Sequence, residues 1–264
     1  MILTLMSYNI ERGFHSRDHL LEEHRLKAAQ RAVQQVKPDI LALTEACYGG
    51  PNSQRIEMDY QTIFCFFYGK FGEYPNFGPR EGDEGGNCLL SQFPLQAEAI
   101  HLAYKGAVRG KIQLEEKILT IDVVHPSYSV DDKEKISTLR PLITSRQEPY
   151  LLTGDFNTVH PDDKYDWNQI VQDLKSYNLE KAQWIVENWR KAELISWLLE
   201  QNLEDAFPVN ARESTVPTGK KNAGVRMDFF FKSLDLKVKE AYVLKNEDTE
   251  IASDHYPIVV KFDI

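Results

Sequence analysis

Polar residues recur along this sequence at the ends of apolar runs. Asp155 and Asn157 follow the run Leu151–Leu152 almost at once, and on their own they would indicate no more than a turn. Six other polar residues hold comparable positions: Asn9, Glu45, His125, Asp228, Asp254 and His255. Strand ends that meet at one edge of a sheet are where α/β proteins usually carry out chemistry, so we interpret the set as a candidate active site.

The residue types in this set suit the metal-assisted hydrolysis of a phosphoester. Mg²⁺ prefers oxygen ligands and keeps several waters, so one or two carboxylates are enough to bind it. Glu45 is the first candidate ligand, with an amide oxygen of Asn9 nearby and Asp254 as an outer ligand. Mn²⁺ is the alternative cation for the same donors.

The remaining members of the set would act on the water and on the phosphate. Asp155 or His255 could activate or orient the attacking water, and Asp228 could fix the tautomer of His255. Asn157 and His125 are candidates for stabilising the charge that builds on the phosphoryl oxygens.

Simpler interpretations exist for some of these residues. Asn9 could bond only the local backbone, and His125, which precedes a proline, could be structural. Arg226 could contact a phosphate of the substrate, but a surface ion pair explains it equally well. The histidines outside the set are expected at the surface: His15, His19, His24, His101 and His160.

The hydrophobic pattern predicts the scaffold that would position these residues. Residues 2–10 and 39–45 read as buried strands around a helix that Ser16 could cap and that Lys37–Pro38 ends, a βαβ-like opening. A second helix is expected over 131–145, and further strands within 86–95, 107–115, 117–126, 149–153, 215–233, 236–244 and 256–264. Because no linker or fixed-period repeat interrupts the chain, we predict one α/β domain over residues 1–264.

Two segments depart from this simple alternation. Residues 48–86 are rich in Gly, Pro and aromatic residues, which predicts a long surface loop. Residues 162–203 are predicted to be mostly helical, with a Trp-rich insertion at about 162–200 that carries all four tryptophans. Tryptophans in such a stretch are more typical of core packing than of a lid or a base-stacking surface.

Composition sets broad limits on function. The 31 Lys and Arg residues against 40 Asp and Glu give a net charge of −9, so the chain has no general attraction to nucleic acid or anionic membranes. A bound cation could still reverse the field locally. The three cysteines form no CxxC pair, no apolar stretch is long enough to span a membrane, and the N-terminus reads as a strand rather than a signal peptide. We therefore expect a cytoplasmic monomer.

The motifs occur in the order found in the endonuclease/exonuclease/phosphatase superfamily. The segments that carry this resemblance are SYNIERG, DILALTEA, GGNCLLSQFPL, VVHPSY, LLTGDFNT, RMDFFFKS and ASDHYPIVV. The chain resembles abasic-site endonucleases, deoxyribonuclease I, neutral sphingomyelinases and inositol-polyphosphate 5-phosphatases from Leu3 to Phe262, with GDFN and SDH as the most specific motifs. The resemblance implies an α/β fold of deoxyribonuclease I type, a four-layer sandwich of two facing mixed β-sheets flanked by helices.

The resemblance also implies a role for each matched residue. It makes Glu45 the metal ligand, with Asn9 beside it and Asp254 completing the surroundings of the metal. The other implied roles are positioning of water and phosphate by Asp155 and Asn157, a contact of His125 with the scissile phosphate, and pairing of Asp228 with His255.

Three hypotheses about function follow. The first is a divalent-metal-dependent phosphodiesterase acting on nucleic acid, which Lys and Arg along a groove would favour. Residues 104–111 and 219–221 supply only a few such basic side chains. The second is the same chemistry on a small molecule or a phospholipid headgroup, which an aromatic rim at 64–77 would favour. The third is a binding protein without turnover, and the complete set of polar residues argues against it.

Overall fold

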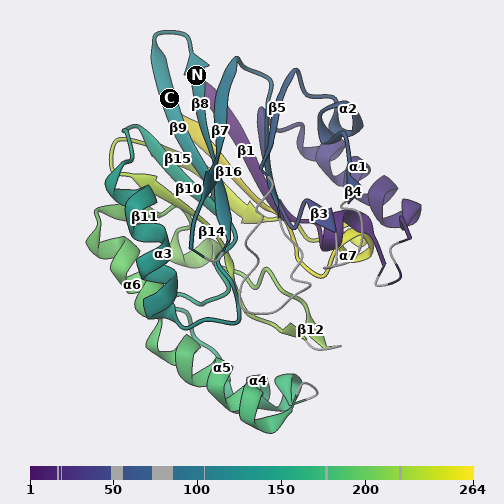
Figure 1. The fold of residues 1–264 in the computed structure, drawn as a ribbon, viewed down its shortest axis with the longest axis vertical. Helices are drawn as coiled ribbons and strands as arrows, with labels where there is room; N and C mark the ends of the chain where they lie inside the picture. Colours follow the sequence, from purple (N-terminus) through teal and green to yellow (C-terminus); the bar gives the residue numbers. More distant parts are fainter. Residues whose placement is uncertain are drawn as a thin grey trace.

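Two β-sheets stack face to face in the middle of the structure (Figure 1). The computed structural model describes residues 1–264 apart from positions 17, 19, 49–55, 73–85, 104, 176–177 and 220–221. At positions 47, 48, 56, 57, 218, 219, 222 and 223 only the backbone is described.

The first sheet is built from both ends of the chain. Its six strands, in spatial order, are β15 (Lys237–Val243), β16 (Ile258–Asp263), β1 (Ile2–Asn9), β2 (Ile40–Thr44), β6 (Asn87–Ser91) and β5 (Tyr68–Gly72). β1 and β2 are parallel, and every other neighbouring pair is antiparallel. The parallel pair is the predicted βαβ-like opening.

The second sheet comes from the intervening part of the chain. Its six strands, in spatial order, are β11 (Leu203–Asp205), β14 (Asp228–Ser233), β10 (Tyr150–Asp155), β9 (Lys117–Val124), β8 (Gly106–Leu114) and β7 (Leu95–His101). Here β9 and β10 are parallel and the other neighbours antiparallel. Both sheets are therefore mixed, as the resemblance implies.

Helices and two short ladders complete the described part of the chain. Its helices are α1 (Glu23–Val36), α2 (Tyr60–Phe64), α3 (Asp132–Thr144), α4 (Trp167–Leu174), α5 (Leu179–Lys191), α6 (Glu193–Glu200) and α7 (Glu247–Ala252), with 3₁₀ turns η1 (Arg12–Phe14) and η2 (Val209–Ala211). Two-stranded ladders pair β3 (Cys47–Tyr48) with β4 (Ile56–Glu57) and β12 (Thr218–Gly219) with β13 (Asn222–Ala223).

Side chains alternate between two faces of each strand, and this alternation produces four layers. The inward faces of both sheets share one apolar core, which includes Leu5 of β1 and Ile121 of β9. The outer face of the first sheet packs against α1, α2 and α7, and that of the second sheet packs against α3 and α6 (Figure 1). The predicted four-layer sandwich is confirmed.

The start of α1 differs from the prediction. Ser16 does not cap this helix, because its hydroxyl accepts hydrogen bonds from the backbone N–H groups of Asp18 and Leu20 within a turn of its own. The helix begins seven residues later, at Glu23, and ends as predicted, with Lys37 in the left-handed conformation after Val36. Its buried alanines, Ala28, Ala29 and Ala32, let it lie close to the sheet.

The segment 48–86 is more structured than a surface loop. Asp59 accepts a hydrogen bond from the Thr62 backbone N–H and so caps α2, and β5 completes the edge of the first sheet. Gly69 of β5 lies where a Cβ would come within 2.8 Å of the Leu90 side chain, which explains a glycine inside a strand. Residues 49–55 and 73–85 of this segment lie outside the described residues.

The predicted helical segment after residue 162 is confirmed as α4, α5 and α6. Asp166 and Asn178 cap α4 and α5 by accepting hydrogen bonds from backbone N–H groups of the first turn. Trp189 and Trp197 are buried as expected, whereas Trp184 is 39% exposed. No helix in the described part of the chain is long and apolar enough to cross a membrane. A single domain, a monomer and a cytoplasmic location stay predictions.

Candidate functional site

Gly154 brings the ends of two parallel strands together. Its φ is +138°, and a Cβ at this position would lie 1.8 Å from the Val124 carbonyl oxygen, so only glycine allows β10 to approach β9 this closely. The residues that follow, Asp155 and His125, are neighbours as a result. The distance from Asp155 Oδ2 to His125 Nε2 is 3.4 Å.

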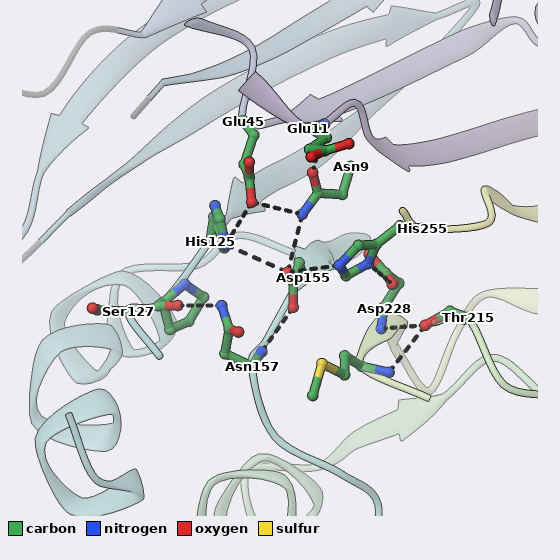
Figure 2. A network of polar contacts seen from close by, with 12 residues as sticks. Asn9, Glu11, Glu45, His125, Ser127, Asp155, Asn157, Thr215, Asp228 and His255 are labelled. Atoms are coloured by element: carbon green, nitrogen blue, oxygen red, sulfur yellow. Dashed lines mark hydrogen bonds and ion pairs between the residues drawn. The ribbon is translucent and has the colours of Figure 1, made fainter. Parts of the chain in front are cut away.

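Asn9 and Glu45 reach the same place from the first sheet, at the ends of β1 and β2. Asn9 Nδ2 donates to Asp155 Oδ2 over 3.1 Å and to Glu45 Oε1 over 3.2 Å, which links the two sheets (Figure 2). The Asn9 oxygen accepts from the Glu11 backbone N–H. Asn9 thus turns its amide nitrogen toward the carboxylates, whereas the sequence suggested that its amide oxygen would lie near the metal.

The Glu45 carboxylate is held by the turn that follows β1. The Arg12 backbone N–H donates to Glu45 Oε2, and Glu45 itself has a left-handed backbone with φ of 52°. Burial opposes ionisation of this carboxyl, yet attraction to His125 and Lys105 outweighs burial and lowers the pKa of Glu45. Glu45 is therefore a carboxylate that stays charged in a largely buried position.

Glu45, His125 and Asp155 each present one donor atom, and these atoms all lie within 4.8 Å of one another. Two carboxylate oxygens and an imidazole nitrogen are donors that divalent cations accept. Among the described acidic and histidine side chains, this group could hold a metal, and the metal roles expected for Asn9 and Asp254 stay predictions. Asp254 lies near enough to interact electrostatically with Glu45 and Asp155, and burial raises its pKa.

Asp228, at the start of β14 in the second sheet, orients His255, which precedes β16 of the first sheet. Asp228 is paired in register with Asp155 on the neighbouring strand, and its Oδ2 lies 2.8 Å from His255 Nδ1. The Thr215 hydroxyl accepts from the Asp228 backbone N–H and fixes the start of β14. His255 Nε2 then points toward Asp155 Oδ2, 3.7 Å away (Figure 2).

The charges around His255 determine its protonation. Burial alone would lower the pKa of His255, but attraction to Asp228 and Asp155 outweighs burial and raises this pKa well above its ordinary value. The same attraction, together with His125, lowers the pKa of Asp155 against the effect of burial. Burial raises the pKa of Asp228 in spite of its imidazole partner. A protonated imidazole between two carboxylates is the arrangement that these shifts favour.

Asn157 sits in a left-handed conformation with φ of 49°, which Asn tolerates better than most residues. Its backbone N–H donates to Asp155 Oδ1 over 2.8 Å, and its Nδ2 donates to the Pro126 carbonyl (Figure 2). Its backbone carbonyl accepts hydrogen bonds from Lys135 Nζ at 2.7 Å and from Trp189 Nε1 at 3.2 Å. These contacts anchor the backbone of Asn157 and orient its carboxamide.

Sequence reasoning missed the support beneath Asn157. Lys135 is 3% exposed and pairs with Asp132 over 3.0 Å, and Asp132 also accepts from Thr158 Oγ1 and from the Leu194 backbone N–H. The signal in the sequence is an Asp and a Lys three residues apart in a predicted helix. That spacing is common on exposed helix faces, so nothing in it indicates burial.

Arg226, suggested as a phosphate contact, is instead a buried structural residue. Its side chain is 2% exposed, and its Nε and Nη1 donate to Asp163 and Asp205 over 2.9 and 2.8 Å. Its guanidinium also lies 4.5 Å from the centroid of the Phe229 ring. Each of its three nitrogen atoms donates to a carboxylate and the side chain is buried, so the structure holds Arg226 away from the surface. His15 and His160, expected at the surface, are also buried.

Taken together, the site offers a group of metal-ligand type, a buried carboxylate that stays ionised and an oriented imidazole. Carboxylates can bind a cation or accept a proton from water, and a protonated imidazole can donate to an anion. The neighbouring carboxamide of Asn157 is a further hydrogen-bond donor to an oxyanion.

Comparison with known proteins agrees with this fold. The chain is 18% identical to an AP endonuclease from Archaeoglobus fulgidus (TM-score 0.69, covering 99% of this chain and 100% of that one). It is 14% identical to D. rerio TDP2 complexed with a single-strand DNA product (TM-score 0.62, 100% and 99%) and 16% identical to ANGEL2, a 2',3'-cyclic phosphatase, in complex with adenosine-2',3'-vanadate (TM-score 0.62, 99% and 95%). Comparison with curated protein sequences finds no match.

The fold and its site agree with a match to a family of phosphoester hydrolases. The sequence model of that family matches residues 6–255, from β1 to the histidine that pairs with Asp228. The chain belongs to the endonuclease/exonuclease/phosphatase family.

Proposed function

We propose that this protein is a divalent-metal-dependent phosphodiesterase. The observation that carries the proposal is the position of the Asp155 carboxylate. One of its oxygens lies within 3.1–3.7 Å of nitrogen atoms of Asn9, His125 and His255, which come from both sheets and the segment after α7. A buried carboxylate surrounded in this way is suited to chemistry on a water and an anion.

The donor set fits a hard divalent cation such as Mg²⁺ or Mn²⁺. Glu45, His125 and Asp155 would hold it, with the Asn9 amide keeping the two carboxylates in place. A cation bound there would neutralise phosphate charge and polarise the phosphoryl oxygens. It would also offset the acidity of the chain at the point where an anionic substrate has to approach.

The protein's own residues would divide the remaining work. Asp155 Oδ2 would accept a hydrogen bond from the attacking water and hold it in line with the phosphorus. His255, kept protonated and oriented by Asp228, would donate from Nε2 to a phosphoryl oxygen. Asn157 Nδ2 would exchange the Pro126 carbonyl for a phosphoryl oxygen of the substrate.

The hydrolysis of a generic phosphodiester tests the proposal. Protein stripped with EDTA should be inactive, and Mg²⁺ or Mn²⁺ should restore turnover. Asp155→Asn should lower kcat by about a hundredfold or more, the usual scale for losing a group that orients or deprotonates water. Asp162→Asn is the matched control, because its side chain is 75% exposed and lies outside the site.

Two results would contradict the proposal. The first is full turnover in the presence of excess chelator. The second is an Asp155→Asn variant as active as Asp162→Asn. Binding of Mn²⁺, followed by its electron paramagnetic resonance signal, gives a readout without turnover, and Glu45→Gln should weaken this binding.

A further inference from the structure

A recess beside the candidate site is walled by aromatic side chains. Tyr128, Trp184 and Trp189 line it together with Ile185, Asn188 and Asn157. Its empty volume is about 280 Å³, part of it open to solvent. Because this volume includes open solvent, the aromatic recess is a hollow in the surface against which a flat group can lie, not a pocket that encloses a ligand.

The aromatic recess is continuous with the residues that would handle the phosphate. Asn157 lines both, and Tyr128 follows His125 by three residues. Asn157 Nδ2 donates to the Pro126 carbonyl, and Trp189 Nε1 donates to the Asn157 carbonyl, so the walls are tied to each other. A group that occupies the recess is therefore held next to a phosphate at the candidate site.

Two of the aromatic rings that line the recess are half-exposed. Trp184 and Tyr128 are 39% and 41% exposed, whereas Trp197, on the next helix, is 8% exposed and packs in a core. Large aromatic side chains gain most from burial, so two half-exposed rings lining one hollow are typical of a binding surface. Lys181 Nζ lies 5.0 Å from the centroid of the Tyr128 ring and connects this ring to the same helix as Trp184.

We propose that the aromatic recess binds the nucleobase attached to the phosphate that is hydrolysed. The inference rests on the proposed function and names its substrate class: phosphodiesters of nucleotides whose base is unpaired. Every nucleobase has a π-face that can stack on Trp184 or Tyr128, which requires no excess of positive charge. A base inside a duplex would first have to leave its stack, so single strands or free nucleotide esters are the better substrates.

Two chromogenic substrates isolate the contribution of the base. Thymidine 5′-(p-nitrophenyl phosphate) and methyl p-nitrophenyl phosphate lose the same leaving group, and only the first carries a base. Trp184→Ala should raise KM for the thymidine ester by about 5- to 150-fold, the range that stacking of one base contributes. It should leave hydrolysis of the methyl ester nearly unchanged, and Trp184→Phe should recover most of the loss.

Phe67→Ala is the matched control, because this ring is 74% exposed and does not line the recess. Equal losses on both esters, or no loss in Trp184→Ala, would overturn the proposal. Calorimetry with thymidine 5′-monophosphate and inorganic phosphate adds a readout without turnover. The monophosphate should bind more tightly, and Trp184→Ala should abolish the difference.

The failure of this inference can be told from failure of the proposed function. If neither ester is hydrolysed with Mg²⁺ or Mn²⁺, the proposed function fails; if both are hydrolysed at equal rates by the unchanged protein, only the recess assignment fails. Oligothymidylate used better than the mononucleotide ester would identify single-stranded nucleic acid, and equal use would identify free nucleotides. A duplex used better than the same single strand would contradict the inference.

Discussion

The buried ion pair beneath Asn157 leads to a quantitative prediction for the variant Lys135→Met. Methionine replaces the ammonium with an uncharged group of similar length, so packing is largely kept. The change removes the donor 3.0 Å from Asp132 Oδ1 and 2.7 Å from the Asn157 carbonyl. Both side chains of the pair are no more than 3% exposed, so water cannot replace the lost partner.

The expected loss of unfolding free energy depends on the hydrogen bonds that Asp132 retains in Lys135→Met. Removing one member of a buried ion pair typically costs about 3–5 kcal/mol, because the other charge is left buried and uncompensated. Asp132 Oδ2 retains its donors, Thr158 Oγ1 at 3.0 Å and the Leu194 backbone N–H at 3.1 Å. Burial lowers the pKa of Lys135 although Asp132 attracts its charge. Desolvation therefore already reduces the net stabilisation that the ion pair gives to the folded state. We therefore expect the low end, about 3 kcal/mol.

Urea unfolding followed by far-UV circular dichroism measures this loss as a shift of the midpoint at constant slope. Lys27→Met is the matched control, since Lys27 forms an exposed pair with Glu23 and should cost less than about 0.5 kcal/mol. The double variant Asp132→Asn with Lys135→Met removes both charges and should be less destabilised than Lys135→Met alone. A loss below about 1 kcal/mol in Lys135→Met, or a double variant at least as destabilised as Lys135→Met alone, would refute the reasoning.

Two further predictions concern single positions. Gly154→Ala should abolish activity and destabilise the fold severely, because the added Cβ meets the Val124 carbonyl oxygen at 1.8 Å; a soluble and active variant, judged by expression and turnover, would contradict this close approach. Burial, then Arg212, lowers the pKa of His160 below its ordinary 6.5, so the unfolded chain binds the proton more tightly and stability falls as pH drops below about 6.5. His160→Asn should lack this loss, so the difference in unfolding free energy between the two proteins should change between about pH 7 and pH 5; a constant difference would disprove it.

The sequence predicted the elements whose pattern is local. Apolar runs such as 40–45 and 149–153 became buried strands, and Asp155 follows its run because the strand ends there. The edge strand β5 could not be predicted from periodicity, because Gly69 and Gly72 resemble loop residues unless the packing of Leu90 against the backbone is known. Local signals therefore fixed the central strands better than the edges.

The residues of the site were predictable by type but not by contact. That Asp228 would meet His255 follows from matching motifs, but the partners of Arg226 do not. Its guanidinium binds carboxylates 63 and 21 positions away in the sequence, and no local sequence pattern predicts contacts between residues so far apart. The orientation of the Asn9 amide likewise depends on the Glu11 backbone N–H, which only the folded turn places. Such contacts arise from tertiary structure.

The seam between the sheets has a consequence for how the protein would lose function. Asn9 and Glu45 lie at strand ends of one sheet, whereas His125 and Asp155 lie at strand ends of the other. The distances between their side chains therefore depend on how the two sheets pack against each other. A slide of one sheet over the other would pull these atoms apart and break the Asn9–Asp155 hydrogen bond, while the backbone hydrogen bonds within each sheet stayed intact. Inactivation on warming can then precede loss of secondary structure, and a changed side-chain volume in the apolar layer between the sheets can alter turnover from a distance.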